Sequence, residues 1–371
     1  MDLDPGMLER IRARAGDLDR ENRFFHDDLR DLREAGYLRP RPLLETIRDQ
    51  RALAAVAPAT ALGVNMHHVW MGVARILHER GDHSLDWVLR DGEAGELFAF
   101  GISEPGNDEV LWDSSTEVTR VDGGYAFTGT KVFTSLAPAW TRLGVFGRWE
   151  SPDGPRLVHG ILTRDDASTL EGVAPIEILD DWDTLGMRAT QSRTTRLHGA
   201  IVPDARITRI LPVGPNADPL VFGIFANFLL SIGSVYAGIA DRALQLAVDS
   251  ARSRVSRATG RPVAEDPVVR WALADAAIAL DALAPDLESL AADVDALADR
   301  GAGWFRSLTG AKHRAVETAR VVVDAAARVA GGSGYRNASE LARLQRDVLA
   351  GVFHPSDSAS VHRTVAANLL G

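Results

Sequence analysis

The chain has 371 residues, with 41 Lys and Arg against 51 Asp and Glu, and a formal net charge of −10. It contains no cysteine, which excludes disulfides, Cys-ligated zinc, iron–sulfur clusters and thiol nucleophiles. The acidic balance argues against nucleic acid as a partner. A chain of this length is expected to form about two or three domains.

Membrane and export signals are absent from the sequence pattern. No apolar run reaches the roughly 18 uncharged residues that a membrane helix needs, and the best run covers only Leu220 to Ile232. The first five residues are acidic and lack the basic and apolar regions of a signal peptide. We therefore expect a cytoplasmic protein that has no membrane segment.

The first 95 residues have a helical pattern. Leu8, Ile11, Ala15 and Leu18 recur at spacings of three and four residues, which places them on one helix face. Further helices are expected over residues 43–57 and 60–79. This pattern predicts an N-terminal helical domain over residues 1–95.

Short strand signals replace the helical pattern from residue 96 onward. Alternating or apolar runs separated by turn residues occur at 97–102, 115–120, 125–133, 143–149, 157–163 and 194–201. They predict an antiparallel β domain of barrel or sandwich type over residues 96–210.

Helical periodicity then returns and continues to the end of the chain. The expected helices cover residues 222–253, 267–284, 286–299, 304–330, 339–349 and 358–370. Long helices with short connections predict a C-terminal helical bundle over residues 211–371. The fold class is therefore α+β, with a β domain between two helical parts.

Two segments in the β part carry groups suited to a planar ligand. Ile102 and Ser103 follow an apolar strand, where backbone N–H groups and a hydroxyl can meet a polar ligand edge. Phe133 stands beside the hydroxyls of Thr134 and Ser135, so this segment could stack on a flat ring and donate hydrogen bonds to it. Viewed singly, the first segment also fits a plain turn and the second a hairpin strand.

Two further segments lie in the helical part. Gly331, Gly332 and Gly334 follow a long helix and permit close backbone approach to a ligand, although a helix C-cap has the same pattern. His354 and Asp357 share a loop near the C-terminus and form a possible acid/base site, for which a solvated loop is the alternative.

Metal and phosphate patterns are weaker. No HExxH or comparable metal spacing occurs, so no metal site is predicted. Arg252, Arg254, Arg257 and Arg261 form a basic cluster that could face phosphates, or could be a solvated helix face.

The order of these segments is more informative than any one of them. The motifs, in chain order, are Ile102-Ser103-Glu104-Pro105-Gly106, Gly129-Thr130-Lys131-Val132-Phe133-Thr134-Ser135, Leu185-Gly186-Met187-Arg188-Ala189-Thr190, Val202-Pro203, Gly331-Gly332-Ser333-Gly334-Tyr335 and Leu344-Gln345-Arg346-Asp347. This series resembles the acyl-CoA dehydrogenase family over nearly the whole chain. The corresponding runs in that family read like TEPGAGSD, GTKxWITN, LGMRGS, Val-Pro, GGxGY and RLYRD.

The resemblance implies a flavin cofactor, FAD or else FMN, held between the β domain and the C-terminal helices. It places the segments at Ser103 and Phe133 beside the flavin ring. It also implies that the glycine run of residues 331–334 approaches the ADP half of the cofactor, often from a neighbouring subunit of a homodimer or homotetramer. Its implied partners are a small-molecule substrate, either an acyl thioester or an aromatic compound, and a flavin reductase or electron-transfer protein.

The chain departs from the family at the catalytic base. The family's usual Glu lies soon after the Arg-Asp pair, but residues 348–357 contain no Glu, and the alternative position falls near Phe228. Three hypotheses follow. The first is an FAD-dependent acyl thioester dehydrogenase with Asp357 or another group as base. The second is a reduced-flavin-dependent monooxygenase of a two-component system. The third is a non-catalytic flavin- or acyl-binding subunit.

Overall fold

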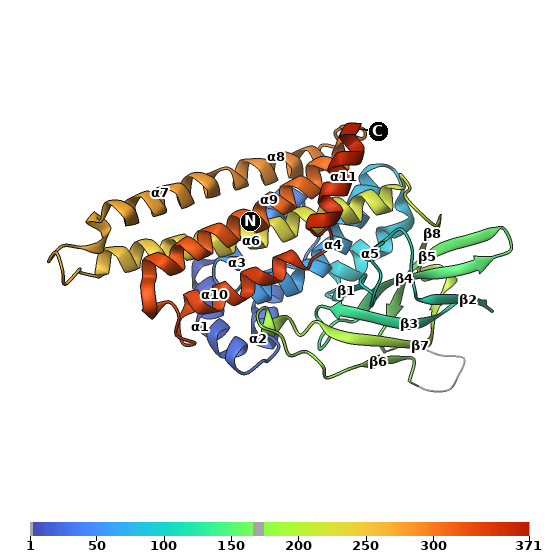
Figure 1. Cartoon of the computed structure of the whole chain (residues 1–371). Helices are drawn as coiled ribbons and strands as arrows, with labels where there is room; N and C mark the ends of the chain where they lie inside the picture. The colour runs from blue at the N-terminus through green and yellow to red at the C-terminus, as the bar shows by residue number, and fades with distance from the viewer. Residues whose placement is uncertain (1–2, 166–173, 371) are drawn as a thin grey trace.

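A helical bundle and a β-sheet lie side by side in the computed structural model, which describes residues 3–165 and 174–370 (Figure 1). Helices from both ends of the chain form the bundle, and the sheet comes from the middle of the sequence. This arrangement confirms the α+β class predicted from the sequence.

The N-terminal helices surround one almost fully buried member. They are α1 (Pro5–Arg20), α2 (His26–Glu34), α3 (Leu43–Ala54), α4 (Pro58–Glu79) and α5 (Asp86–Glu93), with the 3-10 turn η1 (His83–Leu85) before α5. Helix α4 is buried along most of its length, and its buried residues include the polar side chains of Asn65, His67 and His68. His67 of α4 accepts a hydrogen bond from the backbone N–H of Phe98 at 3.2 Å, which holds the first strand against the helix.

The sheet is mixed and not purely antiparallel, which corrects the sequence prediction. Its strands are β1 (Phe98–Gly101), β2 (Glu117–Val121), β3 (Gly124–Thr134), β4 (Arg142–Ser151), β5 (Gly154–Thr163), β6 (Ile176–Ile178), β7 (Arg193–Pro203) and β8 (Ile207–Pro212). The order is β6-β7-β3-β2-β4-β5-β8, and β1 pairs with β4. Both β1 and β2 run parallel to β4, because neither reaches it through a hairpin. The sequence pattern did not predict the short strands β6 and β8.

The C-terminal bundle is built around α6. Its helices are α6 (Pro219–Ser253), α7 (Pro267–Asp281), α8 (Leu283–Asp295), α9 (Gly303–Ala330), α10 (Glu340–Leu349) and α11 (Ser358–Leu370). Among the described residues α6 is the one helix long and apolar enough to cross a membrane, but 89% of its most apolar window is buried inside the protein. Its apolar surface therefore packs against α9, α4 and α3.

One hydrophobic core extends through the helical parts and the sheet. Trp70 of α4 connects the helical part to the sheet. Its indole N–H donates to the carbonyl of Ala99 at 3.2 Å, and its ring packs on Phe100. Because the core is continuous, the domain boundaries near residues 95 and 210 stay predictions from the sequence.

Candidate functional site

The ends of β1 and β3 bring two of the predicted ligand-binding segments together. The backbone N–H of Val132 donates to the carbonyl of Ser103 at 2.9 Å, and these two residues form an isolated antiparallel bridge. Ile102 beside them is buried. The structure thus places Ile102 and Ser103 next to the segment of residues 133–135, although they are about thirty positions apart in the chain.

Phe133 points away from the core at the end of β3. The pairing of β3 with β7 changes register between Lys131 and Thr134, and Phe133 has a φ of +55°. Its ring is 60% exposed and meets Trp182 edge-on at 6.1 Å between ring centroids. An exposed aromatic ring of this kind offers a stacking surface to a flat ligand.

A row of hydroxyl groups lies beside Phe133. The hydroxyls of Ser135 and Ser192 are 2.7 Å apart, and Ser192 donates to Thr190 at 2.8 Å. Within the described part of the chain, the buried hydroxyl of Thr134 has no hydrogen-bond partner. Buried polar groups are nearly always paired in native proteins, so this hydroxyl fits the polar edge of a bound group. The exposed ring and the unpaired hydroxyl together fit a flavin ring.

A fully buried ion pair fixes the two strand ends from behind. The ammonium group of Lys131 lies 2.5 Å from a carboxylate oxygen of Glu104 and donates to the carbonyl of Phe146 at 2.8 Å. Glu104 also accepts hydrogen bonds from Ser114 and Thr116, each at 2.6 Å. Burial by itself would raise the pKa of Glu104, but Lys131 and these hydroxyls hold it well below its ordinary value. Both residues belong to the sequence motifs given above, but the motifs did not predict that the two side chains pair.

The loop between β6 and β7 docks on α10. A Cβ atom at Gly186 would overlap the backbone carbonyl of Arg346, so only glycine allows this approach. The backbone N–H of Met187 donates to the Asp347 carboxylate at 2.6 Å, and burial raises the pKa of that carboxyl to about 6. The loop carries Trp182 at one end, and therefore connects the neighbourhood of Phe133 to the C-terminal bundle.

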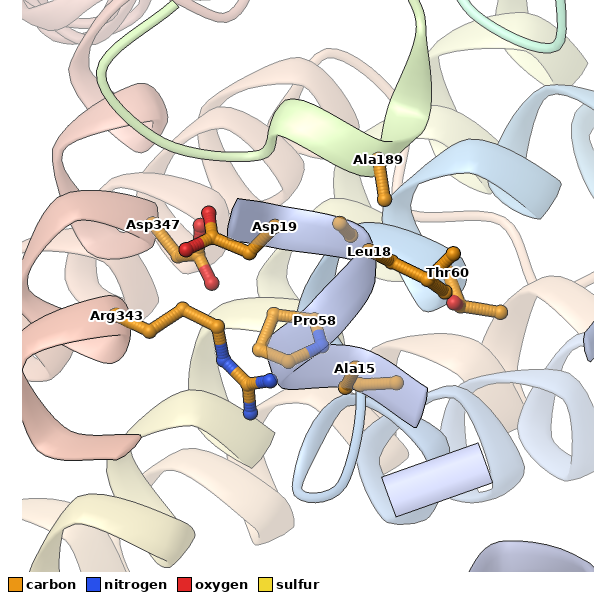
Figure 2. A pocket seen from close by; sticks show the side chains of 10 residues that line it. Ala15, Leu18, Asp19, Pro58, Thr60, Ala189, Arg343 and Asp347 are labelled. Carbon is orange, nitrogen blue, oxygen red and sulfur yellow. The ribbon is translucent and has the colours of Figure 1, made fainter. Parts of the chain in front are cut away.

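Figure 2 shows a crevice beside this docking point, where Asp19 of α1 lies next to Asp347 and Arg343 of α10. Its volume is only about 10 Å³. Ligand pockets are usually hundreds of Å³, so this crevice is too small for a substrate or cofactor.

A larger open groove of about 750 Å³ is lined by α1, by the loop before β7 and by α10 with the residues just before it. Five arginines and two acids line it together with small and amide side chains: Arg12, Arg20, Arg188, Arg343, Arg346, Asp19 and Glu340. Guanidinium groups recognise phosphates well. The sequence pattern did not predict this groove, because its arginines come from three separate segments.

The glycine run lies far from the strand ends within one chain. Gly331 ends α9 with a φ of +63°, and the side chain of Arg254 donates to the carbonyls of Val329 and Ala330 at 2.7 and 3.0 Å. Figure 1 shows this end of α9 on the side of the bundle opposite the sheet. One chain therefore does not bring Gly331, Gly332 and Gly334 to the site at Phe133. Their contact with cofactor through a neighbouring subunit stays a prediction.

The segment between α10 and α11 carries His354. Its ring nitrogen Nε2 shares a hydrogen bond with the Tyr236 hydroxyl at 2.8 Å. Burial, together with the charge of Lys312, lowers the pKa of His354 to about 3. The Lys312 ammonium group donates to the carbonyls of Gly351, His354 and Ser356 at 3.0–3.1 Å and so fixes the loop. His354 and Tyr236 are therefore a neutral pair at ordinary pH.

Asp357 has a different environment from His354. Its side chain accepts a hydrogen bond from the backbone N–H of Ser360 at 2.8 Å, which caps α11. In the described residues no hydrogen bond or ion pair joins it to His354. The acid/base pair predicted from the sequence is thus not assembled in this structure.

Replacing Asp357 with Ala should reveal this capping role. Loss of a helix N-cap typically costs about 1 kcal/mol, so chemical denaturation should show a decrease of that size in the free energy of unfolding. Asp357→Ser, which keeps a capping oxygen, should stay close to the wild type. If both variants lost turnover equally and kept full stability, a catalytic role for Asp357 would replace the capping one.

Comparison with known proteins gives a consistent family. Residues 230–358 match the family described as the acyl-CoA dehydrogenase C-terminal domain. The pigment production hydroxylase of Rhodococcus erythropolis is 30% identical over 67% of this chain and 67% of its own. The putative acyl-CoA dehydrogenase YdbM of Bacillus subtilis is 26% identical over 97% of this chain and 94% of its own.

A solved structure agrees over the whole length. The structure of KijD3 in complex with FMN and dTDP-3-amino-2,3,6-trideoxy-4-keto-3-methyl-D-glucose has a TM-score of 0.85 and 26% identity, and covers 99% of this chain and 91% of the other. The fold and these relatives define a flavin-dependent oxidoreductase that uses FAD or FMN. The chain belongs to the acyl-CoA dehydrogenase family.

Proposed function

We propose that this protein is a reduced-flavin-dependent monooxygenase of a two-component system, acting on a small aromatic or amine-bearing substrate. A separate flavin reductase would supply the reduced flavin. When bound, the reduced flavin provides the electrons with which dioxygen is split, one oxygen atom entering the product and the other leaving as water.

The observation that carries this proposal is the lack of a carboxylate base. Acyl thioester dehydrogenation needs a base for the α-proton, and general bases typically contribute about 10²–10⁴-fold to the rate. The stretch that follows Asp347, residues 348–356, contains no Glu, and Asp357 caps a helix. The other family position holds Phe228, which is buried in α6. Oxygenation needs no such base, and a neutral His354–Tyr236 pair is compatible with it.

Three half-buried aromatic side chains pack together and would offer an apolar wall to a substrate. Trp112 stacks on Phe225 at 5.6 Å between ring centroids, and Phe305 meets Phe225 edge-on at 5.3 Å. These rings come from the loop before β2 and from the first turns of α6 and α9. An apolar wall with few polar groups favours an aromatic substrate over a charged one.

The amine alternative within the substrate class has independent support. The KijD3 structure holds FMN together with an amino sugar nucleotide, and it is 26% identical to this chain over nearly the full length. Five arginines line the groove of about 750 Å³, and each is paired with an acidic side chain, so phosphates of such a ligand or of the cofactor would bind there by displacing those carboxylates.

Oxygen dependence tests the proposal. The purified chain should retain little flavin, and with a flavin reductase, NADH and a panel of aromatic compounds and primary amines it should form a product that carries label from isotopically labelled dioxygen. The control is the same protein with short, long and branched acyl-CoAs under anaerobic conditions. Bleaching of bound flavin by an acyl-CoA, or product formed equally well without oxygen, would establish the dehydrogenase hypothesis instead.

The His354–Tyr236 pair should matter for turnover. His354→Ala is expected to lower kcat by less than the 10²–10⁴-fold that a general acid or base typically contributes, because an imidazole with a pKa of about 3 is a weak base at ordinary pH. Tyr236→Phe removes only the shared hydrogen bond and should have a smaller effect. Because the pKa of His354 is about 3, protonation of its imidazole should not lower the rate near pH 6.5. The pH profiles of the wild type and His354→Ala should therefore have the same shape in that range. The measurement is oxygen-coupled product formation between pH 5.5 and 8.5.

A further inference from the structure

The turn between α4 and α5 gathers three side chains that are good metal ligands. His78 lies in the last turn of α4, His83 in η1, and Asp86 is the first residue of α5. Gly81 has a φ of +81°, which lets the chain reverse direction directly after α4. This reversal turns both imidazoles toward the Asp86 carboxylate.

One potential ligand atom from each of the three groups lies within 4.8 Å of the other two. Nδ1 of His78 lies 2.8 Å from one oxygen of Asp86, and Nδ1 of His83 lies 3.1 Å from the other. The two Nδ1 atoms are 3.2 Å apart. Around Zn²⁺, with bonds of about 2.0–2.1 Å, neighbouring ligand atoms are separated by roughly 2.9 Å at octahedral and 3.4 Å at tetrahedral angles. All three contacts are close to this range.

Hydrogen bonds account for two of the three contacts. Each Nδ1 atom carries at most one proton. Each imidazole can donate its Nδ1 proton to a different oxygen of Asp86, which leaves the contact between the two Nδ1 atoms without a hydrogen bond. A cation at the centre satisfies the three contacts together.

We propose that His78, His83 and Asp86 form a binding site for a divalent transition metal ion of the Zn²⁺ or Ni²⁺ type. Two imidazoles and one carboxylate suit such ions, whereas Mg²⁺ and Ca²⁺ take oxygen ligands. The side chains are 49%, 63% and 28% exposed, so an ion can reach them and keep water on its open positions.

Contacts with the sheet hold the turn that carries His78, His83 and Asp86 in place. Arg209 of β8 pairs with Asp82 and donates to the hydroxyl of Ser84 at 2.9 Å, which holds the turn against the sheet. None of these residues belongs to the strand-end site at Phe133. A bound ion would therefore link the end of α4 to the start of α5, and its binding should not depend on flavin.

Zn²⁺ titration of the untagged full-length chain tests the proposal. We expect one Zn²⁺ per chain, and a thermal midpoint that rises when Zn²⁺ is added, because a ligand that binds only the folded state stabilises it. His83→Ala and Asp86→Asn should each weaken binding by at least about 10-fold, as losses around metal sites commonly do. Mg²⁺ should leave the midpoint unchanged.

His313→Ala is the matched control. His313 and His362 also form a surface pair, with ring centroids 5.5 Å apart, but among the described residues only His78, His83 and Asp86 form a cluster with metal-ligand geometry. The control should keep the wild-type stoichiometry and affinity. Circular dichroism of His83→Ala checks that the fold is intact. Equal Zn²⁺ affinity in the wild type and His83→Ala, or an equal response to Mg²⁺, would overturn the proposal.

Discussion

Lys131→Met is expected to destabilise the protein by about 3–5 kcal/mol, because it leaves the Glu104 carboxylate buried without its counter-charge. Neither side chain of this pair is exposed to solvent. The hydroxyls of Ser114 and Thr116 still donate to Glu104 in the variant, but neutral donors do not replace an ammonium group. Chemical denaturation followed by circular dichroism measures the loss.

The same variant should also lose affinity for flavin. Glu104 follows directly after Ser103, and Lys131 lies two positions before Phe133, so the ion pair sets the separation of the two strand ends. Fluorescence titration with FMN and FAD, under conditions where the variant is still folded, measures this second effect.

Two comparisons make the prediction specific. The double variant Glu104→Gln/Lys131→Met removes both charges and should recover part of the stability, since a buried pair replaced as a whole is often neutral. Arg120→Met breaks the exposed ion pair with Asp204, and exposed pairs are worth at most about 1 kcal/mol. A Lys131→Met variant that loses no more stability than Arg120→Met would contradict this prediction.

Stability should decrease steeply as the pH falls below about 6.5. Burial lowers the pKa of His67 to about 4 and of His159 to about 3, and it holds the pKa of His68 well below its ordinary value. In the unfolded chain these histidines bind protons below about pH 6.5, but in the folded chain they do not until the pH is much lower. The unfolded state therefore binds more protons, and the free energy of unfolding decreases as the pH decreases.

The size of this effect follows from proton linkage. Each such histidine contributes up to about 1.4 kcal/mol per pH unit. Asp347 and Asp28 act in the opposite sense, because burial raises the pKa of each in the folded state, that of Asp347 to about 6. The net loss is therefore expected to be about 1–3 kcal/mol per pH unit between pH 6 and pH 4, as denaturant midpoints at a series of pH values would show.

His159→Phe isolates one of these contributions. The His159 ring stacks on Phe146 at 5.4 Å, and in the described residues neither of its ring nitrogens has a hydrogen-bond partner. A phenyl ring should fill the same space without an unpaired polar group or a proton to bind. The variant should be more stable than the wild type, and its advantage should be about 2 kcal/mol larger at pH 5 than at pH 8. His26→Gln, at an exposed position, is the control, and an advantage independent of pH would contradict the prediction.

Local sequence patterns predicted the elements well where the periodicity was long. The helix expected over residues 358–370 has those bounds in the structure, and the one expected over 304–330 begins a single residue earlier. The strands β6 and β8 were missed, because three and six residues give little alternation to detect. The parallel pairing of β1 and β2 with β4 was also missed, since direction depends on how distant segments meet.

The candidate site shows the same division. The residues beside the strand ends could be named from their motifs, because a hydroxyl and an aromatic at a strand end already suggest a planar ligand. The contact of Tyr236 with His354 could not be predicted, because the two residues are 118 positions apart and come from α6 and a loop. Asp357 had a suitable chemical type for a base, but the start of α11 determines that it caps a helix.

The sequence by itself determined the α+β class and the kinship with flavin-dependent oxidoreductases. The class follows from local periodicity, and the kinship follows from the order of the motifs. Only the tertiary structure decided which groups meet: the buried pair of Glu104 with Lys131, the neutral pair of His354 with Tyr236, and the cluster of His78, His83 and Asp86. The physical reason is that charge state, proton affinity and metal binding depend on burial and on distances of a few ångströms, which are properties of the packed chain and not of any segment alone.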